Sequence, residues 1–416
     1  MRVLWFSINP SLYNSQRDDH NGGGWIESLE RIVHSVSGIE LGIVFLSQED
    51  SPSRVEMNGT IYYPLFFKRN FFEKIIDKYT YKKIDPLIIN RSLECIEDFK
   101  PDIIHIFGSE FSFGLLSLYT KIPIVIHMQG CWPPYENAQF PPGVSFLSYA
   151  LSLMKCPKKL LGLFLRSHLF KERTFREELV LKHTNFFMGR TRWDYSISKL
   201  YSPFSSYYFC SEALRNSFYN AKKWELKRKE TFRIVSIGGP HFLKGYDVIL
   251  KTAKLLVKLT DLKFEWILIG PSTSSMEVYE KITGINCKDV HVMAMGKQDE
   301  SDIIQILLDS HLFVHASYID NSSNAICEAQ YIGMPIIATN SGGTPSLFAS
   351  DYDATLLVPT NDPYYLASKI YELTSNEEKM LAASKSNISI AETRHNPNNI
   401  KKSLLETYES IIKREY

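Results

Sequence analysis

The sequence predicts an α/β protein made of two doubly wound domains, each with a parallel sheet between helices. A chain of 416 residues with 44% hydrophobic and 22% charged residues is long enough for two or three compact domains. Short apolar runs separated by helical stretches recur along it, which is typical of parallel strands joined by crossover helices. The pattern stops at a charged segment, residues 222–231, and then begins again.

Both halves follow this pattern. In the first half, residues 1–221, the expected strands are 3–8, 41–46, 102–107 and 124–128. In the second half, residues 222–398, they are 233–238, 264–270, 290–296, 311–317 and 335–339, with helices expected over 246–259, 301–310 and 325–332. Residues 399–416 have helical periodicity and form a separate last segment. Two such domains place loops at the carboxyl ends of their strands, where ligands bind in this class.

Composition excludes several classes of protein. A net charge of +1 indicates no nucleic-acid partner. The six cysteines are scattered without metal-ligand spacing, so we expect reduced thiols in a cytoplasmic protein. The first residues are typical of a strand rather than a leader peptide, and no apolar run reaches the roughly 18 residues of a membrane-spanning helix.

Residues 318–343 carry the most chemical information. Asp320 and Glu328 are separated by seven residues between an expected strand and an expected helix. Asn321 to Asn324 are turn and N-cap residue types, so we expect their side chains to cap that helix. A helix N-terminus at the carboxyl edge of a parallel sheet favours an anion such as a diphosphate. The alternative is an ordinary capped helix with an exposed glutamate.

The order strand, acid, Asn-Ser-x-Asn, acid, Gly-x-Pro, strand and Gly-Gly resembles the donor site of family 4-like retaining glycosyltransferases of the GT-B superfold, of the bacterial surface-polysaccharide type. The resemblance implies that Glu328 holds the ribose of a nucleotide-sugar and that Asp320 contacts the donor sugar. It also implies that the last helix, residues 399–416, packs back on the first domain. The residues implied to bind the donor are Gly23, Gly24, Gly238, Lys244, Asn321, Ser322, Ser323, Asn324, Ala325 and Glu328.

Four further candidate residues lie outside the acid pair. Gly23 and Gly24 follow the first strand and match the family's first glycine loop, although a flexible turn explains them as well. His127 ends an expected strand, where the family keeps a histidine that contacts the donor sugar; a structural histidine is the alternative. Lys244 lies six residues after Gly238, as in the family, and would neutralise the diphosphate, whereas a solvated lysine is the plain alternative. His105 is expected to be structural.

The chain departs from the family pattern at three positions. Asp320 replaces a glutamate, Gly239 replaces an arginine, and Ser346 stands where a glutamate usually follows the Gly-Gly pair. These departures keep open a catalytically degenerate scaffold that only binds a sugar nucleotide. A nucleotide-sugar epimerase or hydrolase on the same fold is the other alternative, and it requires acid-base groups that the sequence does not reveal.

The resemblance implies a UDP- or GDP-sugar donor and a saccharide or lipid-linked saccharide acceptor. Catalysis would depend on His127, Lys244 and Asp320, with retention of anomeric configuration. The resemblance implies metal-independent catalysis, so we expect neither a metal nor another cofactor.

Two segments, residues 66–83 and 153–176, mix aromatic or aliphatic residues with Lys and Arg. Such segments suit the surface of an anionic membrane, which would place the protein peripherally on the inner face of the plasma membrane. An amphipathic helix packed on the core with a solvated basic face is the alternative, and both interpretations stay open.

Overall fold

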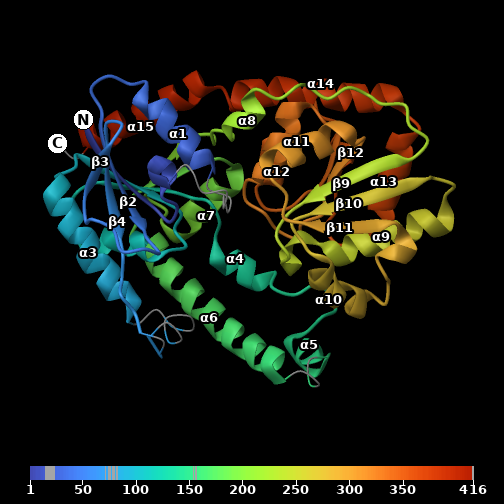
Figure 1. Ribbon diagram of the computed structural model, residues 1–416. Coiled ribbons are helices and arrows are strands. Elements are labelled where there is room, and N and C mark those ends of the chain that lie inside the picture. The colour runs from blue at the N-terminus through green and yellow to red at the C-terminus, as the bar shows by residue number, and fades with distance from the viewer. Residues whose placement is uncertain are drawn as a thin grey trace. The chain divides into compact units, whose positions relative to one another are not determined.

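The computed structural model describes residues 1–14, 24–70, 72, 73, 76, 80, 83–152, 154 and 157–414. These residues form two compact units. The first contains Met1–Asn137, Phe146–Ala213 and Pro397–Tyr416, and the second contains Ala138–Ser145 and Leu214–Asn396. Each unit is built on a mostly parallel sheet with helices (Figure 1), so the predicted α/β class with two doubly wound sheets is confirmed.

The first unit has an eight-stranded sheet in the order β3-β4-β2-β1-β5-β6-β7-β8, parallel except for the β3–β4 pair. Its strands are β1 (Arg2–Ser7), β2 (Glu40–Leu46), β3 (Val55–Met57), β4 (Thr60–Leu65), β5 (Ile103–Phe107), β6 (Ile124–His127), β7 (Phe186–Gly189) and β8 (Ser206–Phe209). The four strands expected from the sequence are all present. β3, β4, β7 and β8 were not predicted, because three are short and β4 contains Pro64, which lowers strand propensity.

The helices of this unit alternate with its strands. They are α1 (Gly24–His34), α3 (Ile84–Phe99), α4 (Trp132–Asn137), α5 (Phe146–Ser152), α6 (Pro157–Lys182), α7 (Arg192–Tyr201) and α15 (Pro397–Arg414), with 3₁₀ turns η1 (Ser11–Asn14) and η2 (Ser112–Leu118). The local signals are clear for α7, where Thr191 and Asp194 form a capping box.

The C-terminal helix α15 is fastened to the first sheet by buried polar contacts. Trp5 Nε1 donates a hydrogen bond to the Tyr408 hydroxyl at 3.0 Å, and His105 Nδ1 lies 2.6 Å from the same oxygen. All three side chains are buried, and burial lowers the pKa of His105 to about 3. Residues separated by about 400 positions therefore share one core, and Figure 1 shows the red α15 beside the blue strands.

The second unit has a six-stranded, fully parallel sheet in the order β11-β10-β9-β12-β13-β14. Its strands are β9 (Phe232–Ile237), β10 (Phe264–Ile269), β11 (Val292–Gly296), β12 (Leu312–His315), β13 (Ile336–Thr339) and β14 (Leu357–Val358). Its helices are α8 (Asn216–Tyr219), α9 (Tyr246–Leu259), α10 (Thr273–Thr283), α11 (Glu300–Asp309), α12 (Asn324–Ile332), α13 (Pro363–Thr374) and α14 (Glu377–Arg394), with 3₁₀ turns η3 (Phe242–Lys244), η4 (Lys288–Val290), η5 (Thr344–Leu347) and η6 (Ala354–Leu356).

The strand order creates a topological switch point between β9 and β12. The chain moves outward from β9 to β10 and β11, then returns to the other side of β9 as β12. The loops that leave the carboxyl ends of β9 and β12 therefore diverge to opposite faces of the sheet, and in open α/β sheets ligands bind at such a point. Within the part of the chain that the structure describes, no helix has the length and apolar character needed to cross a bilayer.

Candidate functional site

Two loops meet at the switch point of the second sheet. The loop after β9 ends at Gly245, and the loop after β12 begins at Ala316. Tyr318 N donates a hydrogen bond to the Leu243 carbonyl at 2.8 Å, so the loops are joined through their backbones. Gly245 has φ +68°, and a Cβ there would lie 2.0 Å from the Ala316 carbonyl oxygen. Only glycine allows this approach, and it brings Lys244 beside the second loop.

Lys244 and Asp320 form an ion pair where these loops meet. The distance from Lys244 Nζ to Asp320 Oδ2 is 2.5 Å, and His315 Nε2 lies 3.2 Å from the same oxygen. The Asp320 side chain is only 14% exposed and His315 is almost fully buried. The structure therefore brings together two residues predicted to be catalytic, and each neutralises the other in the absence of a ligand.

The surroundings of Asp320 and His315 determine the protonation states of these two side chains. Burial alone would raise the pKa of Asp320, but the charge of Lys244 and the contacts of His315 and Lys244 outweigh it and hold that pKa well below its usual range. Burial lowers the pKa of His315 and outweighs the opposing hydrogen bond and charge of Asp320, while the charge of Lys244 adds a smaller lowering effect. At neutral pH the cluster is thus an ammonium, a carboxylate and a neutral imidazole.

His315 was not singled out from the sequence. It lay inside the run 311–317, which was assigned only as a strand. The available signal was its place as the last residue of a strand at the carboxyl edge of the sheet, the same signal that drew attention to His127.

The Gly-Gly turn after β13 contacts the backbone of Asp320. Gly343 N donates to the Asp320 carbonyl at 2.9 Å, and Asn321 N donates to Asp320 Oδ1 at 3.0 Å. Gly342 has φ +54°, and a Cβ there would lie 2.1 Å from the Asp320 carbonyl oxygen. This glycine is therefore required to hold Asp320. Ser346, at the position of the family's glutamate, lies in η5, where its carbonyl accepts a hydrogen bond from Arg394 at 3.2 Å.

The N-terminus of α12 differs from the sequence expectation. The helix begins at Asn324 and its N-cap is Ser323, whose side chain makes no capping hydrogen bond. The prediction that Ser323 caps this helix with its side chain is wrong, because the Ser323 hydroxyl makes no capping hydrogen bond. Asn321, Ser322 and Ser323 are buried, whereas Asn324 and Ala325 are partly exposed. The helix therefore begins without a capping bond from its N-cap residue.

Glu328 lies one turn inside α12 and is bound by an arginine. Arg215 Nε is 2.7 Å from Glu328 Oε1, and Arg215 Nη2 is 2.8 Å from Glu328 Oε2. The Glu328 side chain is 7% exposed, so the alternative of an exposed glutamate on a capped helix is wrong. Arg215 was missed because it is 113 residues away in sequence and lies in no recognisable motif.

Gly238 and Gly239 make room for Lys244. A Cβ on Gly238 would lie 3.2 Å from the Lys244 side chain, and the Gly238 carbonyl accepts a hydrogen bond from the Tyr246 hydroxyl at 2.7 Å. A Cβ on Gly239, where the family has arginine, would lie 3.1 Å from the His241 ring. The missing arginine therefore leaves Lys244 as the cation placed directly at this turn.

The first unit holds the remaining candidates. His127 ends β6 and is fully buried, with its Nδ1 3.3 Å from His105 Nε2 and its ring edge-on to Trp25. Burial, followed by the charges of His105 and Arg190, lowers the pKa of His127 well below its usual value, so the imidazole is neutral. Gly24 is the first residue of α1, and Gly23 lies outside the described residues.

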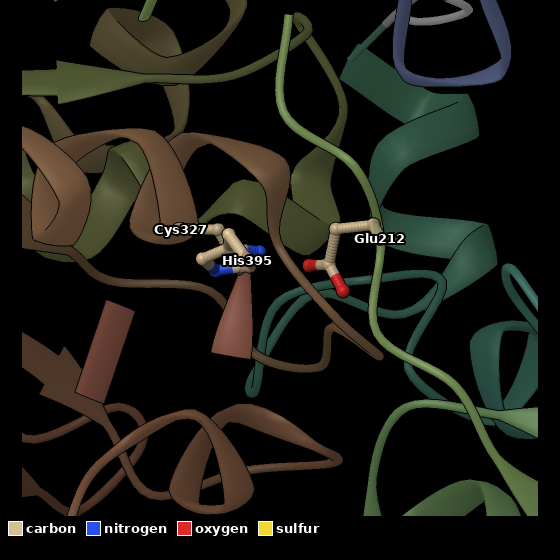
Figure 2. Close-up of side chains that lie close together, drawn as sticks. All are labelled: Glu212, Cys327 and His395. Atoms are coloured by element: carbon tan, nitrogen blue, oxygen red, sulfur yellow. The ribbon is translucent and has the colours of Figure 1, made fainter. Parts of the chain in front are cut away.

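A cysteine and a histidine lie close together in the second unit. Potential ligand atoms of Cys327 and His395 are within 4.8 Å of each other, and both residues are buried (Figure 2). Glu212, which Figure 2 also draws, belongs to the first unit. Structural zinc sites use four protein ligands and catalytic ones three. Two side chains of one unit do not reach that number, so we assign no metal site to the described residues.

Comparison with known proteins places a recognised domain over this site. Residues 219–389 match the family model "Glycosyl transferases group 1". The 2-deoxystreptamine N-acetyl-D-glucosaminyltransferase of Niallia circulans is 28% identical over 168 residues, which is 40% of this chain and 42% of that protein. An uncharacterized glycosyltransferase of Methanocaldococcus jannaschii is 27% identical over 137 residues, 32% of this chain and 36% of that protein. The chain thus spans less than half the length of these curated relatives.

Solved structures are similar over nearly the whole chain. Sucrose-phosphate synthase from Thermosynechococcus elongatus has a TM-score of 0.72 at 13% identity and covers 99% of both chains. Anabaena HepE in complex with UDP and glucose has a TM-score of 0.64 at 13% identity, covering 99% of this chain and 100% of that one. The trehalose-6-phosphate protein from E. coli bound with UDP-2-fluoro glucose has a TM-score of 0.65 at 12% identity, covering 98% and 99%. The fold is GT-B, and its second unit contains a glycosyltransferase group 1 domain.

A double-mutant cycle tests whether Lys244 and Asp320 stabilise each other. We expect Lys244→Met and Asp320→Asn each to destabilise the second unit, because each leaves a buried charge without its partner. The double variant should recover part of that loss, with a coupling of about 1–3 kcal/mol in urea unfolding. The exposed pair Arg228 and Glu377 is the matched control, and solvent screening should leave its coupling much smaller. Equal coupling in the two pairs would contradict the assignment.

Proposed function

We propose that this protein is a glycosyltransferase that moves a sugar from a nucleotide-sugar donor to a hydroxyl group of a saccharide or lipid-linked saccharide. One observation carries the proposal. Lys244, Asp320 and Glu328 gather around the N-terminus of α12, at the switch point of a sheet in a glycosyltransferase group 1 domain. This arrangement offers a cation, helix amides and a carboxylate to the diphosphate and ribose of one ligand.

The donor proposed first is a UDP-sugar, with a GDP-sugar as the alternative. Two proteins of the same fold were solved with UDP or a UDP-sugar analogue. In the proposed complex, the diphosphate lies at the α12 amides and Lys244, while Glu328 accepts hydrogen bonds from the ribose hydroxyls. Asp320 accepts a hydrogen bond from the donor sugar, because a carboxylate that stays ionised is a hydroxyl acceptor and not a proton donor.

Donor binding has an electrostatic consequence for the free site. The Lys244 ammonium is paired with Asp320 before the donor arrives. A diphosphate carries more negative charge than one carboxylate, so it attracts Lys244 toward itself. The same movement frees Asp320 Oδ2 for a sugar hydroxyl. We propose that this exchange lets the shorter Asp320 serve where the resembled family has a glutamate.

The proposed transfer needs no reagent besides the donor and the acceptor. The acceptor oxygen forms a bond to the anomeric carbon as the bond from that carbon to the phosphate oxygen breaks, and the acceptor proton passes to the leaving phosphate. Front-face attack of this kind retains the anomeric configuration. Lys244 and the α12 amides stabilise the charge that develops on the diphosphate, so the proposed step uses no divalent metal.

Two other functions predict different products. A hydrolase or epimerase on the same fold releases or rearranges the sugar without an acceptor. A scaffold binds the nucleotide-sugar without turnover. The deep burial and ion pairing of Asp320 argue against its use as the general acid that these hydrolytic reactions need.

Activity measurements on a panel of UDP- and GDP-sugars with acceptor extracts test the proposal. We expect transfer to be faster than hydrolysis. Lys244→Ala should lower kcat at least about 100-fold, since it removes a charge that stabilises the leaving group. Glu328→Gln should raise the donor KM at least about tenfold, the value of a hydrogen bond to a charged group.

The matched controls are ion-paired residues of the same unit away from the switch point. Lys227 pairs with Asp309, and Glu265 lies 2.7 Å from Arg233 near the start of β10. Lys227→Ala and Glu265→Gln should keep wild-type kinetics. Binding of a donor without turnover would favour the scaffold, and unchanged turnover in Lys244→Ala and Glu328→Gln would refute the assigned roles.

The acceptor side is proposed to meet an anionic membrane through α5 and α6. Residues 137–171 contain five Lys or Arg and no Asp or Glu. The large apolar side chains Leu147, Leu151, Met154, Leu161 and Phe164 are each more than half exposed. Apolar groups beside unopposed basic charge fit a lipid surface with negative headgroups.

The geometry of α5 and α6 supports the same surface. Phe146 of α5 packs edge-on against Phe164 of α6 with ring centroids 5.1 Å apart, so the two helices form one apolar patch. Lys158 and Arg166 are exposed on α6. Figure 1 shows the long green α6 extending away from its sheet toward α5. Of the other basic segment, residues 66–83, eight of the 18 residues lie outside the described residues.

Vesicle co-sedimentation tests the membrane proposal. The protein should bind vesicles that contain phosphatidylserine and not vesicles of phosphatidylcholine alone. Lys158→Glu with Arg166→Glu should weaken binding roughly tenfold or more, because each basic residue near the lipid contributes about 1 kcal/mol. Lys402→Glu with Lys413→Glu, the same charge change on exposed positions of α15, is the control. Equal sedimentation of the wild type and both variants would contradict the proposal that α5 and α6 bind a membrane.

A further inference from the structure

Two nitrogen atoms lie close to the same oxygen of Asp320. Lys244 Nζ is 2.5 Å from Asp320 Oδ2, and His315 Nε2 is 3.2 Å from it. The two residues are held differently. His315 ends strand β12 and its side chain is 3% exposed, whereas Lys244 reaches Asp320 on a flexible four-carbon chain that is 24% exposed. A ligand can therefore draw Lys244 away while His315 stays beside the carboxylate.

The charges of this cluster balance only while Lys244 is in place. Burial keeps His315 neutral in the free protein, so Lys244 supplies the positive charge that faces Asp320. In the proposed exchange, Lys244 turns to the diphosphate and Asp320 keeps its negative charge in its buried position. A donor-sugar hydroxyl gives this carboxylate a hydrogen bond but no positive charge. A buried carboxylate without a cation is strongly unfavourable.

The same exchange changes the proton affinity of His315 in one direction. The charged groups that act on its imidazole are Lys244 of η3, which lowers the pKa of His315, and Asp320 of the loop after β12, which raises it. When Lys244 moves away, the lowering effect weakens and Asp320 acts without opposition, so the pKa of His315 rises. Donor binding and proton binding at His315 then favour each other, because coupling between two ligands is reciprocal.

We propose that His315 takes up a proton from solvent when the donor binds and replaces Lys244 as the positive partner of Asp320. His315 is then a positioning residue, which keeps the Asp320 carboxylate ionised and in place for the donor sugar. The inference rests on the proposed function, because the diphosphate is what draws Lys244 away. A histidine that only packs at the end of its strand is the competing explanation, and it predicts no proton uptake by this side chain.

Calorimetric titration with UDP in buffers of different ionisation enthalpy counts the protons taken up on binding. At about pH 6.5, where burial keeps His315 neutral in the free protein, wild type should take up more protons than His315→Gln. The glutamine amide keeps a hydrogen-bond donor but does not titrate. His315→Leu should match His315→Gln in proton uptake. Ionisation of the terminal phosphate of UDP is common to all three proteins and cancels in the difference.

The pH dependence of UDP affinity gives the same information. Because the complex binds a proton that the free protein lacks, affinity should be highest at low pH. It should fall as the pH rises from the pKa of His315 in the free protein to its raised pKa in the complex. Relative to His315→Gln, the fall should approach about tenfold for each pH unit in that window.

His311 is the matched control. It directly precedes β12, at the opposite end of the strand from His315, and it is also buried with a lowered pKa. Its Nδ1 accepts a hydrogen bond from Arg233 N at 2.9 Å, and its Nε2 lies 3.0 Å from the Lys227 carbonyl oxygen. His311→Gln should therefore keep the proton uptake of wild type.

A second measurement needs no variant. In wild-type protein with isotope-labelled histidines, the nitrogen spectrum at about pH 6.5 should show one of the 11 imidazoles changing from neutral to charged as UDP saturates the site. Equal proton uptake in wild type and folded His315→Gln, or no histidine that becomes charged, would overturn the role of His315 while leaving the proposed function intact. If wild type binds neither UDP nor GDP, the proposed function fails and the inference with it; if only GDP binds, GDP replaces UDP in these experiments.

Discussion

The structure of the second unit depends on one constraint, that charges brought into the carboxyl edge of a parallel sheet must be partnered. The return of the chain to the far side of β9 places the loops after β9 and β12 together. Gly245 lets the loop after β9 approach the backbone of Ala316, and Gly342, in the turn after β13, approaches the backbone of Asp320. Lys244 and Asp320 form their ion pair where these segments meet. An unpaired charge at this depth would cost several kcal/mol, so the close backbone approach places both charges where each needs the other.

The same constraint explains why each acid of the 318–343 segment has a cation. Asp320 faces Lys244 and Glu328 faces Arg215, with the N-terminus of α12 between them. In the proposed function, the contact of Lys244 with Asp320 is exchanged for a contact with the diphosphate, so the pairing of these two residues does not oppose donor binding.

Much of this arrangement could be predicted from the sequence, and there is a physical reason why the rest could not be predicted. Buried parallel strands are short apolar runs, so the main strands and the loops that carry Lys244 and Asp320 were predicted. Arg215 was missed, because its partner is 113 residues away and pairing at that range leaves no local pattern. The cap predicted at Ser323 was wrong. The residue type shows only that a hydroxyl is able to cap a helix; whether it does so depends on the local geometry.

A crystal structure of the protein with UDP tests the central claim most directly, because the claim concerns which charged group each atom of the ligand displaces. The account predicts the diphosphate at the α12 amides with Lys244 Nζ in hydrogen-bond contact with a phosphate oxygen and separated from Asp320. It also predicts the ribose within hydrogen-bond distance of Glu328. UDP bound in this site with the Lys244–Asp320 pair unbroken, or with its ribose turned away from Glu328, would contradict the account.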